Sequence, residues 1–188
     1  MTMDSGPKSL FSILGVEARF HLSPDDLEGR FKALSQRLHP DRFARADAKE
    51  RLRALQASTE LNDAYRLLKV PARRGEYLLK LAGVDVTEEG SSDAGRRVKI
   101  DPALLLELLE EREALAEAKA AGDRDKIGAL QAAAEARRAE TLAKIERDFL
   151  RFDEGDRSVV DGLARALIEL RYCDKLLAEV EAILEEQP

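Results

Sequence analysis

Apolar side chains recur at alternating spacings of four and three near the end of the chain, a period of 3.5 residues. That period keeps one face of an α-helix apolar along its whole length, so the helix needs partner helices to cover it. Two further helical segments, at about 101–121 and 124–153, are joined by short connections, which predicts a three-helix bundle. The apolar positions of the last helix are Val159, Leu163, Ala166, Leu170, Cys173, Leu177, Val180 and Leu184.

The composition extends this prediction to the whole chain. Leu, Ala, Glu and Arg dominate and Trp is absent, a usage that favours helices over sheets and indicates an all-α protein. Ser23 followed by Pro24 is typical of a helix start. The predicted helices before the bundle cover residues 10–14, 24–38, 47–69 and 72–83, the two longer ones forming an antiparallel hairpin. The third helix offers five residues for packing: Leu52, Leu55, Leu61, Tyr65 and Leu68.

Residues 84–100 combine Gly, Ser and mixed charge without a period, which predicts a linker or long loop. We therefore expect one domain over 1–83 and a second over 101–188. Their charges differ, because residues 1–100 carry 18 basic and 15 acidic side chains whereas residues 101–188 carry 13 and 22. The two parts are expected to meet different partners.

The sequence RLHPDRF, at residues 37–43, interrupts the helical pattern. Because proline lacks an N–H and disfavours helical backbone before it, the helix should stop near Leu38 and leave His39, Pro40 and Asp41 on a loop tip. One interpretation assigns no function to this stretch and treats it as a turn that only ends a helix. The functional one is a charged tip that docks on an acidic protein surface with salt-sensitive kinetics. Its basic residues would be Arg42 and Arg45 with Arg30, Lys32 and Arg37, the last three assigned to the helix face opposite the apolar stripe.

Catalysis and cofactor binding find little support in the sequence. A catalytic triad needs a nucleophile, a base and an orienting group from separate places, and adjacent residues of one loop are not expected to converge in that way. No Gly-rich phosphate loop or paired histidine motif is present, and a single Cys, Cys173, fits a small core residue. We expect no enzyme activity, no metal and no cofactor. No apolar run reaches the roughly 20 residues of a membrane span and the first 25 residues lack a signal pattern, which predicts a cytoplasmic protein.

A helix with basic residues, His-Pro-Asp and a long antiparallel helix together resemble a J-domain, the module by which co-chaperones engage ATP-driven chaperones. The resemblance continues through STELNDAYRLLKVPARRGEYLLKLAGVDV and LIELRYCDKLLAEVEAIL, which are similar to the HscB family of J-type co-chaperones of iron-sulfur cluster assembly. It covers roughly residues 10–185. It implies an L-shaped molecule with an N-terminal J-domain and a C-terminal three-helix domain. Some relatives carry paired cysteines in an N-terminal metal-binding extension, and this chain has none.

Five leucines between positions 104 and 109 would spread over roughly 200° of a helix surface, wider than the stripe that such a helix normally buries. They either pack against the first domain or form an exposed patch with a polar rim for a partner. The HscB resemblance favours the patch and implies that it binds the scaffold protein. The matching positions are Leu105, Leu106, Leu109, Glu110, Arg112 and Glu113, with Tyr172 at an aromatic position of the last helix.

The resemblance implies two partners: a DnaK- or HscA-type ATP-dependent chaperone and an iron-sulfur cluster scaffold protein of the IscU type. The first would meet the tip at His39, Pro40, Asp41 and the nearby basic residues, and its ATPase would be stimulated. The second would bind the C-terminal helices, and cluster transfer would follow. Two alternatives stay open, a general J-protein that delivers unfolded clients and a purely structural helical adaptor. No aromatic and basic interleaving suggests nucleic acid.

Overall fold

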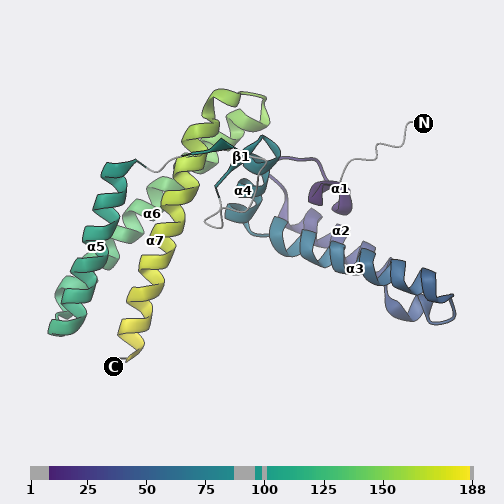
Figure 1. Cartoon of the computed structure of the whole chain (residues 1–188), viewed down its shortest axis with the longest axis horizontal. Helices are drawn as coiled ribbons and strands as arrows, with labels where there is room; N and C mark the ends of the chain where they lie inside the picture. The colour runs from purple at the N-terminus through teal and green to yellow at the C-terminus, as the bar shows by residue number, and fades with distance from the viewer. Residues whose placement is uncertain (1–8, 87–95, 99–100, 187–188) are drawn as a thin grey trace. The chain divides into compact units, whose positions relative to one another are not determined.

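The computed structural model describes residues 9–86, 96–98 and 101–186, without the side chains of Pro40 and Arg97. The chain divides into two compact units, Met1–Leu78 and Leu79–Pro188, so the division falls inside one helix, α4. Helices make up most of both units, as predicted (Figure 1). The elements of the first unit, in chain order, are α1 (Leu10–Leu14), α2 (Pro24–Arg37), the 3₁₀ helix η1 (Pro40–Phe43), α3 (Ala48–Leu68) and the greater part of α4 (Pro71–Leu81).

Side-chain caps set the ends of the helices in the first unit. The Ser23 hydroxyl accepts a hydrogen bond from the Asp26 N–H at 3.3 Å at the start of α2, and Asp47 does the same for the Glu50 N–H at 2.7 Å at the start of α3. Gly15 ends α1 with a φ of 64°, a left-handed conformation that glycine adopts without a steric cost. These local cap residues account for the close match between predicted and observed boundaries.

The core of the first unit lies where α1 packs against α2 and α3. Phe31 of α2 stacks on Tyr65 of α3 with ring centroids 4.1 Å apart, and the Leu10 N–H donates to the Tyr77 hydroxyl of α4 at 3.0 Å. The prediction that Leu52 and Leu55 pack is wrong, since both are exposed. At about 100° per residue they lie on the face of α3 turned away from its buried positions, which are Ala54, Leu61, Ala64 and Leu68.

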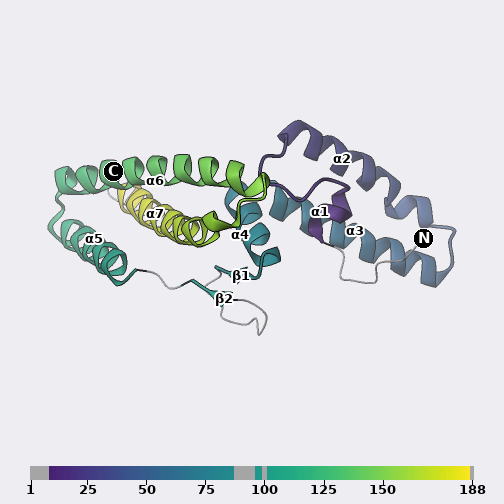
Figure 2. The same cartoon turned by 90° about the horizontal axis from the view of Figure 1, so that it is seen from above.

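The second unit is a three-helix bundle (Figures 1 and 2). Its helices are α5 (Pro102–Ala121), α6 (Arg124–Asp153) and α7 (Val160–Glu186), with the 3₁₀ helix η2 (Arg157–Val159) before α7. Asp101 and Asp123 cap the first two helices, and Gly122, with a φ of 65°, ends α5. Short connections make α5 and α7 both antiparallel to α6, so α5 and α7 run parallel to each other.

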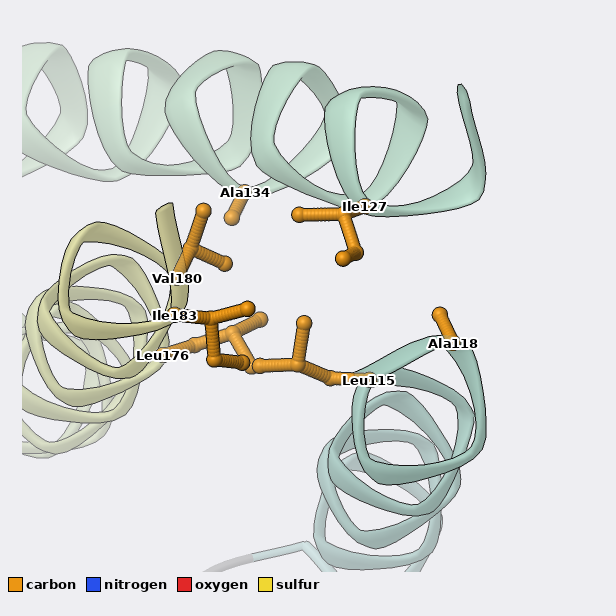
Figure 3. Packing of buried hydrophobic residues seen from close by; sticks show 7 residues of the cluster. All are labelled: Leu115, Ala118, Ile127, Ala134, Leu176, Val180 and Ile183. Carbon is orange, nitrogen blue, oxygen red and sulfur yellow. The ribbon is translucent and has the colours of Figure 1, made fainter. Parts of the chain in front are cut away.

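Seven buried side chains from all three helices meet at one end of this bundle, and their apolar ends point toward one another (Figure 3). They include Leu176, Val180 and Ile183 of α7. The predicted stripe is buried from Val159 to Cys173 and again at Val180. Leu177 is only half-buried while Leu176 is buried, and the prediction is wrong at Leu184, which is exposed while Ile183 is buried. The reason is that this end of α7 faces α5 as well as α6, and the buried stripe turns toward the second partner.

The described residues of the segment predicted as a linker form a short strand pair. Val84–Asp85 (β1) pairs in parallel with Arg96–Arg97 (β2), Arg96 forms an ion pair with Asp161, and Arg171 of α7 donates to the Val86 carbonyl at 2.8 Å. These contacts tie residues 84–86 and 96–97 to the bundle, which explains why the units divide before residue 84. The rest of the predicted linker, 87–95 and 99–100, lies outside the described residues. Within the part of the chain that the structure describes, no helix is both long and apolar enough to cross a bilayer.

Candidate functional site

The first candidate surface is the tip between α2 and α3. The backbone of α2 ends at Leu38, as predicted, and His39 then caps η1 with an extended ψ of 132°. Nδ1 of its imidazole accepts a hydrogen bond from the Asp41 N–H at 3.3 Å. In a neutral ring, an accepting Nδ1 leaves the proton on Nε2. The tip therefore offers a partner a donor at Nε2.

Asp41 completes this tip. Its Oδ2 lies 3.5 Å from His39 Nδ1, and the two side chains are 90% and 59% exposed. The 3₁₀ turn folds the Asp41 side chain back toward the imidazole. Both groups stay accessible, and together they present a donor and a carboxylate at one point of the surface.

The basic residues of α2 do not share one face, which corrects the prediction. Arg30 and Arg37 are seven positions apart and lie within about 20° of each other, whereas Lys32 is turned by about 200° from Arg30. Two of the three are also engaged: Arg30 donates to the Gly15 carbonyl, and Lys32 lies 2.5 Å from Glu28. The hydrogen bond between Lys32 and Glu28 lowers the pKa of the carboxyl and raises the pKa of the ammonium.

The exposed positive charge near His39 and Asp41 comes instead from Arg37, Arg42 and Arg45. All three are exposed, and their side chains form no hydrogen bond or ion pair with the other described residues. Arg37 is in the last turn of α2 and Arg42 is inside η1, so both lie next to His39 in sequence. We name the surface formed by His39, Asp41, Arg37 and Arg42 the tip.

The second candidate surface is on α5. Leu105, Leu106 and Leu109 are 38%, 56% and 50% exposed, whereas Leu108 between them is 5% exposed and belongs to the bundle core. Leu104 is half-buried. The predicted wide apolar arc is therefore real and divides into a buried and an exposed part. We name the exposed part, Leu105, Leu106 and Leu109, the leucine patch.

The rim of the leucine patch is polar, and α7 lies beside it. Glu110 and Glu113 are exposed and form no ion pair with the described residues. Arg112 pairs with Glu179 of α7 at 2.9 Å, and one heptad further on Lys119 pairs with Glu186 at 2.9 Å. Because both pairs join residues 67 positions apart, the same register one heptad earlier places the half-buried Tyr172 at the level of Leu105.

Charge pairs on the other side of α5 hold this helix to α6. The Arg137 guanidinium lies 2.9 Å from Glu111 and 3.9 Å from Glu107. Glu169 of α7 belongs to the same neighbourhood, and its burial raises its carboxyl pKa, with the charges of Arg137, Glu140, Glu107 and Lys144 acting on it. These contacts fix which side of α5 faces the core, so that Leu105, Leu106 and Leu109 stay outside.

A groove between α5 and α7 was not predicted from the sequence. It has a volume of about 460 Å³ and begins at Leu109, so it continues the leucine patch. Its apolar lining is Leu109, Leu115, Ala116, Ala182 and Ile183, and its charged rim is Arg112, Glu113, Lys119 and Glu179. No sequence signal identifies it, because Ala116 and Ala182 face each other only through the register of α5 against α7. We name it the α5–α7 groove.

The sequence is similar to that of known proteins over nearly the whole chain. The co-chaperone protein HscB homologue of Neisseria gonorrhoeae is 33% identical over 174 residues, which are 93% of this chain and 98% of that protein. The homologue of Ralstonia nicotianae is 40% identical over 130 residues, 69% of this chain and 70% of that protein. The chain belongs to the HscB co-chaperone family. A co-chaperone works with a chaperone, so the predicted partnership with a chaperone is confirmed in general terms.

Two further comparisons agree with the family. Residues 100–181 match the family described as the HSCB C-terminal oligomerisation domain. The structure of the chaperone HscB from Vibrio cholerae has a TM-score of 0.74 and 31% identity, and the alignment covers 96% of this chain and all of that one. The human co-chaperone HscB, at 24% identity, has the same fold with a TM-score of 0.74 over the whole of this chain and 87% of its own. The predicted all-α class, with an N-terminal J-domain and a C-terminal helical bundle, is confirmed.

Proposed function

We propose that this chain brings an iron-sulfur cluster scaffold protein of the IscU type to a DnaK- or HscA-type chaperone. The leucine patch with Tyr172 binds the scaffold, and the tip docks on the chaperone and stimulates its ATP hydrolysis. The chain supplies binding surfaces and no chemistry of its own. The observation that carries the proposal is the leucine patch, because three large apolar side chains are exposed on a helix whose neighbouring leucine is buried.

The leucine patch has the anatomy of a protein interface. Its apolar centre is surrounded by Glu110, Glu113 and Arg112, and exposed apolar patches with polar rims mark interaction sites on soluble proteins. An aromatic residue beside it suits a central contact, because tyrosine combines a large apolar ring with a polar end. Tyr172 takes that place, with Lys175 5.9 Å from its ring centroid.

The tip suits a different kind of contact. Its surface is small and polar, and the exposed guanidinium groups of Arg37 and Arg42 attract an acidic partner and raise the rate of encounter. Joining the tip and the leucine patch in one chain keeps the scaffold at a high effective concentration near the chaperone. Two modest affinities are therefore sufficient for a joint complex. The compartment predicted from the sequence, the cytoplasm, stays a prediction.

The experiment that tests this function measures the ATPase rate of the DnaK-type chaperone from the same genome. The rate is compared for the chaperone alone, with this protein, and with this protein plus the scaffold. His39→Gln is expected to return the rate to that of the chaperone alone while helicity and scaffold binding are unchanged, because an exposed tip side chain contributes little to packing. His21→Gln is the matched control, since it replaces the other histidine of the chain and is expected to keep the stimulation.

The outcomes separate the alternatives. Stimulation that rises further with scaffold and vanishes in His39→Gln supports the proposal. Stimulation that responds to a denatured client and not to the folded scaffold indicates a general J-protein. If His39→Gln leaves the stimulation intact, the tip has no role in it. If the protein does not stimulate the chaperone at all, the purely structural adaptor is favoured.

A further inference from the structure

The α5–α7 groove is an apolar space that the bundle leaves open to solvent. Leu115 and Ile183, both buried core residues, form part of its lining, and the small side chains of Ala116 and Ala182 leave room between the helices. A volume of about 460 Å³ is far more than the roughly 10–15 Å³ that one water molecule needs. Covering apolar surface of this kind with a partner lowers the free energy, because the surface is removed from water.

The contacts between α5 and α7 explain why the groove exists. In this stretch the two helices are joined by the exposed ion pairs Arg112–Glu179 and Lys119–Glu186. The long side chains of Arg112 and Lys119 bridge the space between the two helices. Larger apolar residues at these positions would have closed that space. The ion pairs are exposed and a surface pair of this type stabilises weakly. The groove can therefore change its rim contacts at little cost when a partner enters.

Continuity with the leucine patch determines what enters. Leu109 belongs to both surfaces, so a protein that covers Leu105 and Leu109 reaches the groove without a gap. The charge of the rim adds a second requirement. Arg112 and Lys119 are neutralised by glutamates of α7, whereas Glu113 has no ion-pair partner among the described residues. An apolar side chain with a basic neighbour fits this combination.

We infer that the α5–α7 groove is an extension of the scaffold site and receives one apolar side chain of the scaffold, next to a basic residue that meets Glu113. This inference rests on the proposed function, because the same partner occupies the leucine patch. It adds Ala116 and Ala182 to the binding surface. Their role is to be small, since a larger side chain at either position would occupy the space that the partner needs.

The test fills the groove from both walls. Ala116→Leu and Ala182→Leu are made in the full-length chain, and binding to the scaffold protein from the same genome is measured by calorimetry. Both alanines are exposed and leucine is a good helix former, so helicity and thermal stability are expected to stay unchanged. Each is expected to weaken binding by about tenfold or more, as for a central contact. Ala136→Leu, on the exposed face of α6, is the matched control and is expected to bind as the unmodified chain does.

Leu105→Ala in the same series separates the two proposals. If Leu105→Ala weakens binding but both groove variants bind normally or more tightly, the groove is not occupied and only this inference is overturned. If none of the three variants changes the affinity, the proposed function fails with it. The charge requirement is tested by Glu113→Gln, for which a several-fold loss at low salt that disappears at high salt is expected. A loss of affinity that does not depend on salt would show that no basic residue of the scaffold meets Glu113.

Discussion

The tip and the leucine patch are built in opposite ways. The tip is a short polar turn whose shape comes from a helix end, a proline and the hydrogen bond of the Asp41 N–H to His39. The leucine patch is apolar, and its position depends on packing contacts of α5 on the opposite side, including Leu108 and the pairs of Arg137. Local sequence therefore makes the first surface, whereas tertiary structure makes the second.

This difference has consequences for binding. Charged, exposed groups act mainly on the rate of encounter and are screened by salt. Large apolar side chains act mainly on the lifetime of a complex. A co-chaperone that holds one protein while it meets another benefits from one surface of each kind. Substitutions at the tip should therefore change function without changing stability, whereas at α5 the two effects should separate only residue by residue.

The largest expected effect compares two neighbouring leucines of α5. Leu108→Ala is expected to lower the free energy of unfolding by about 2–5 kcal/mol, because it opens a cavity in the bundle core. Leu109→Ala is expected to change that free energy by less than about 0.5 kcal/mol and to cost about 1–4 kcal/mol of scaffold binding. Urea unfolding and calorimetry measure the two quantities. Equal destabilisation by both variants would mean that Leu109 belongs to the core.

How much the sequence could predict follows from the same contrast. The helices that begin after Ser23, Asp47 and Asp101 depend on a capping hydrogen bond to an N–H two or three residues further on. Because this signal is local, the starts of these helices were predicted well. The exposed part of α5 was also accessible, because five leucines span a wider arc than one core can cover. Periodicity failed at Leu52, Leu55 and Leu184. Those residues are apolar and well spaced, and nothing local tells whether a partner helix lies opposite them.

Long-range register accounts for the other misses. The sequence places Arg30, Lys32 and Arg37 on one helix, but it does not show that Arg30 is engaged with Gly15 or Lys32 with Glu28. The same holds for Arg112 with Glu179, which are 67 positions apart. The α5–α7 groove depends entirely on that register. Charge alone therefore did not show which basic side chains of α2 are engaged within the chain, and hydrophobicity alone did not show the groove beside the leucine patch.

A salt series tests whether the two surfaces differ in their electrostatics. At a protein concentration below saturation, chaperone stimulation is expected to fall several-fold between about 0.05 and 0.5 M salt, because screening shortens the range of the arginine charges. Scaffold affinity is followed in the Glu113→Gln variant, which lacks the one charged contact proposed for the α5–α7 groove, and is expected to change by less than about twofold over the same range, since apolar burial dominates it. The ATPase rate and calorimetry provide the two curves. Parallel curves would contradict the distinction between the surfaces.

Matched variants make the salt series specific. Arg37→Gln is expected to reduce stimulation and flatten its salt dependence, because this side chain is exposed and lies at the tip. Lys32→Gln is expected to change both much less, since Lys32 is paired with Glu28 on another face of α2. If Lys32→Gln reduced stimulation more than Arg37→Gln did, the docking surface would lie at the middle of α2 and not at the tip.

The smallest expected effect concerns the charges beneath the leucine patch. Burial raises the pKa of Glu169, and the charges of Arg137, Glu140 and Lys144 of α6 and of Glu107 of α5 also act on its carboxyl. The folded chain thus holds this proton more tightly than the unfolded one. The resulting stabilisation is fully present below the ordinary value of 4.5 and is lost as the pH rises through the raised pKa. Glu169→Gln should therefore melt at a slightly higher temperature than the unmodified chain at pH 7 and at nearly the same temperature at pH 4.

Thermal melts at the two pH values measure this difference, with Glu181→Gln as the control on the exposed face of the same helix. A lower melting temperature of Glu169→Gln at pH 7 would show that attraction to Arg137 and Lys144 outweighs the cost of burial. In that case Glu169 would join Glu107 and Glu111 as an anchor of the helices that carry the leucine patch, and its loss should also weaken scaffold binding. If burial dominates, scaffold binding should be unchanged, because the pairs of Arg137 with Glu111 and Glu107 still hold α5 in place.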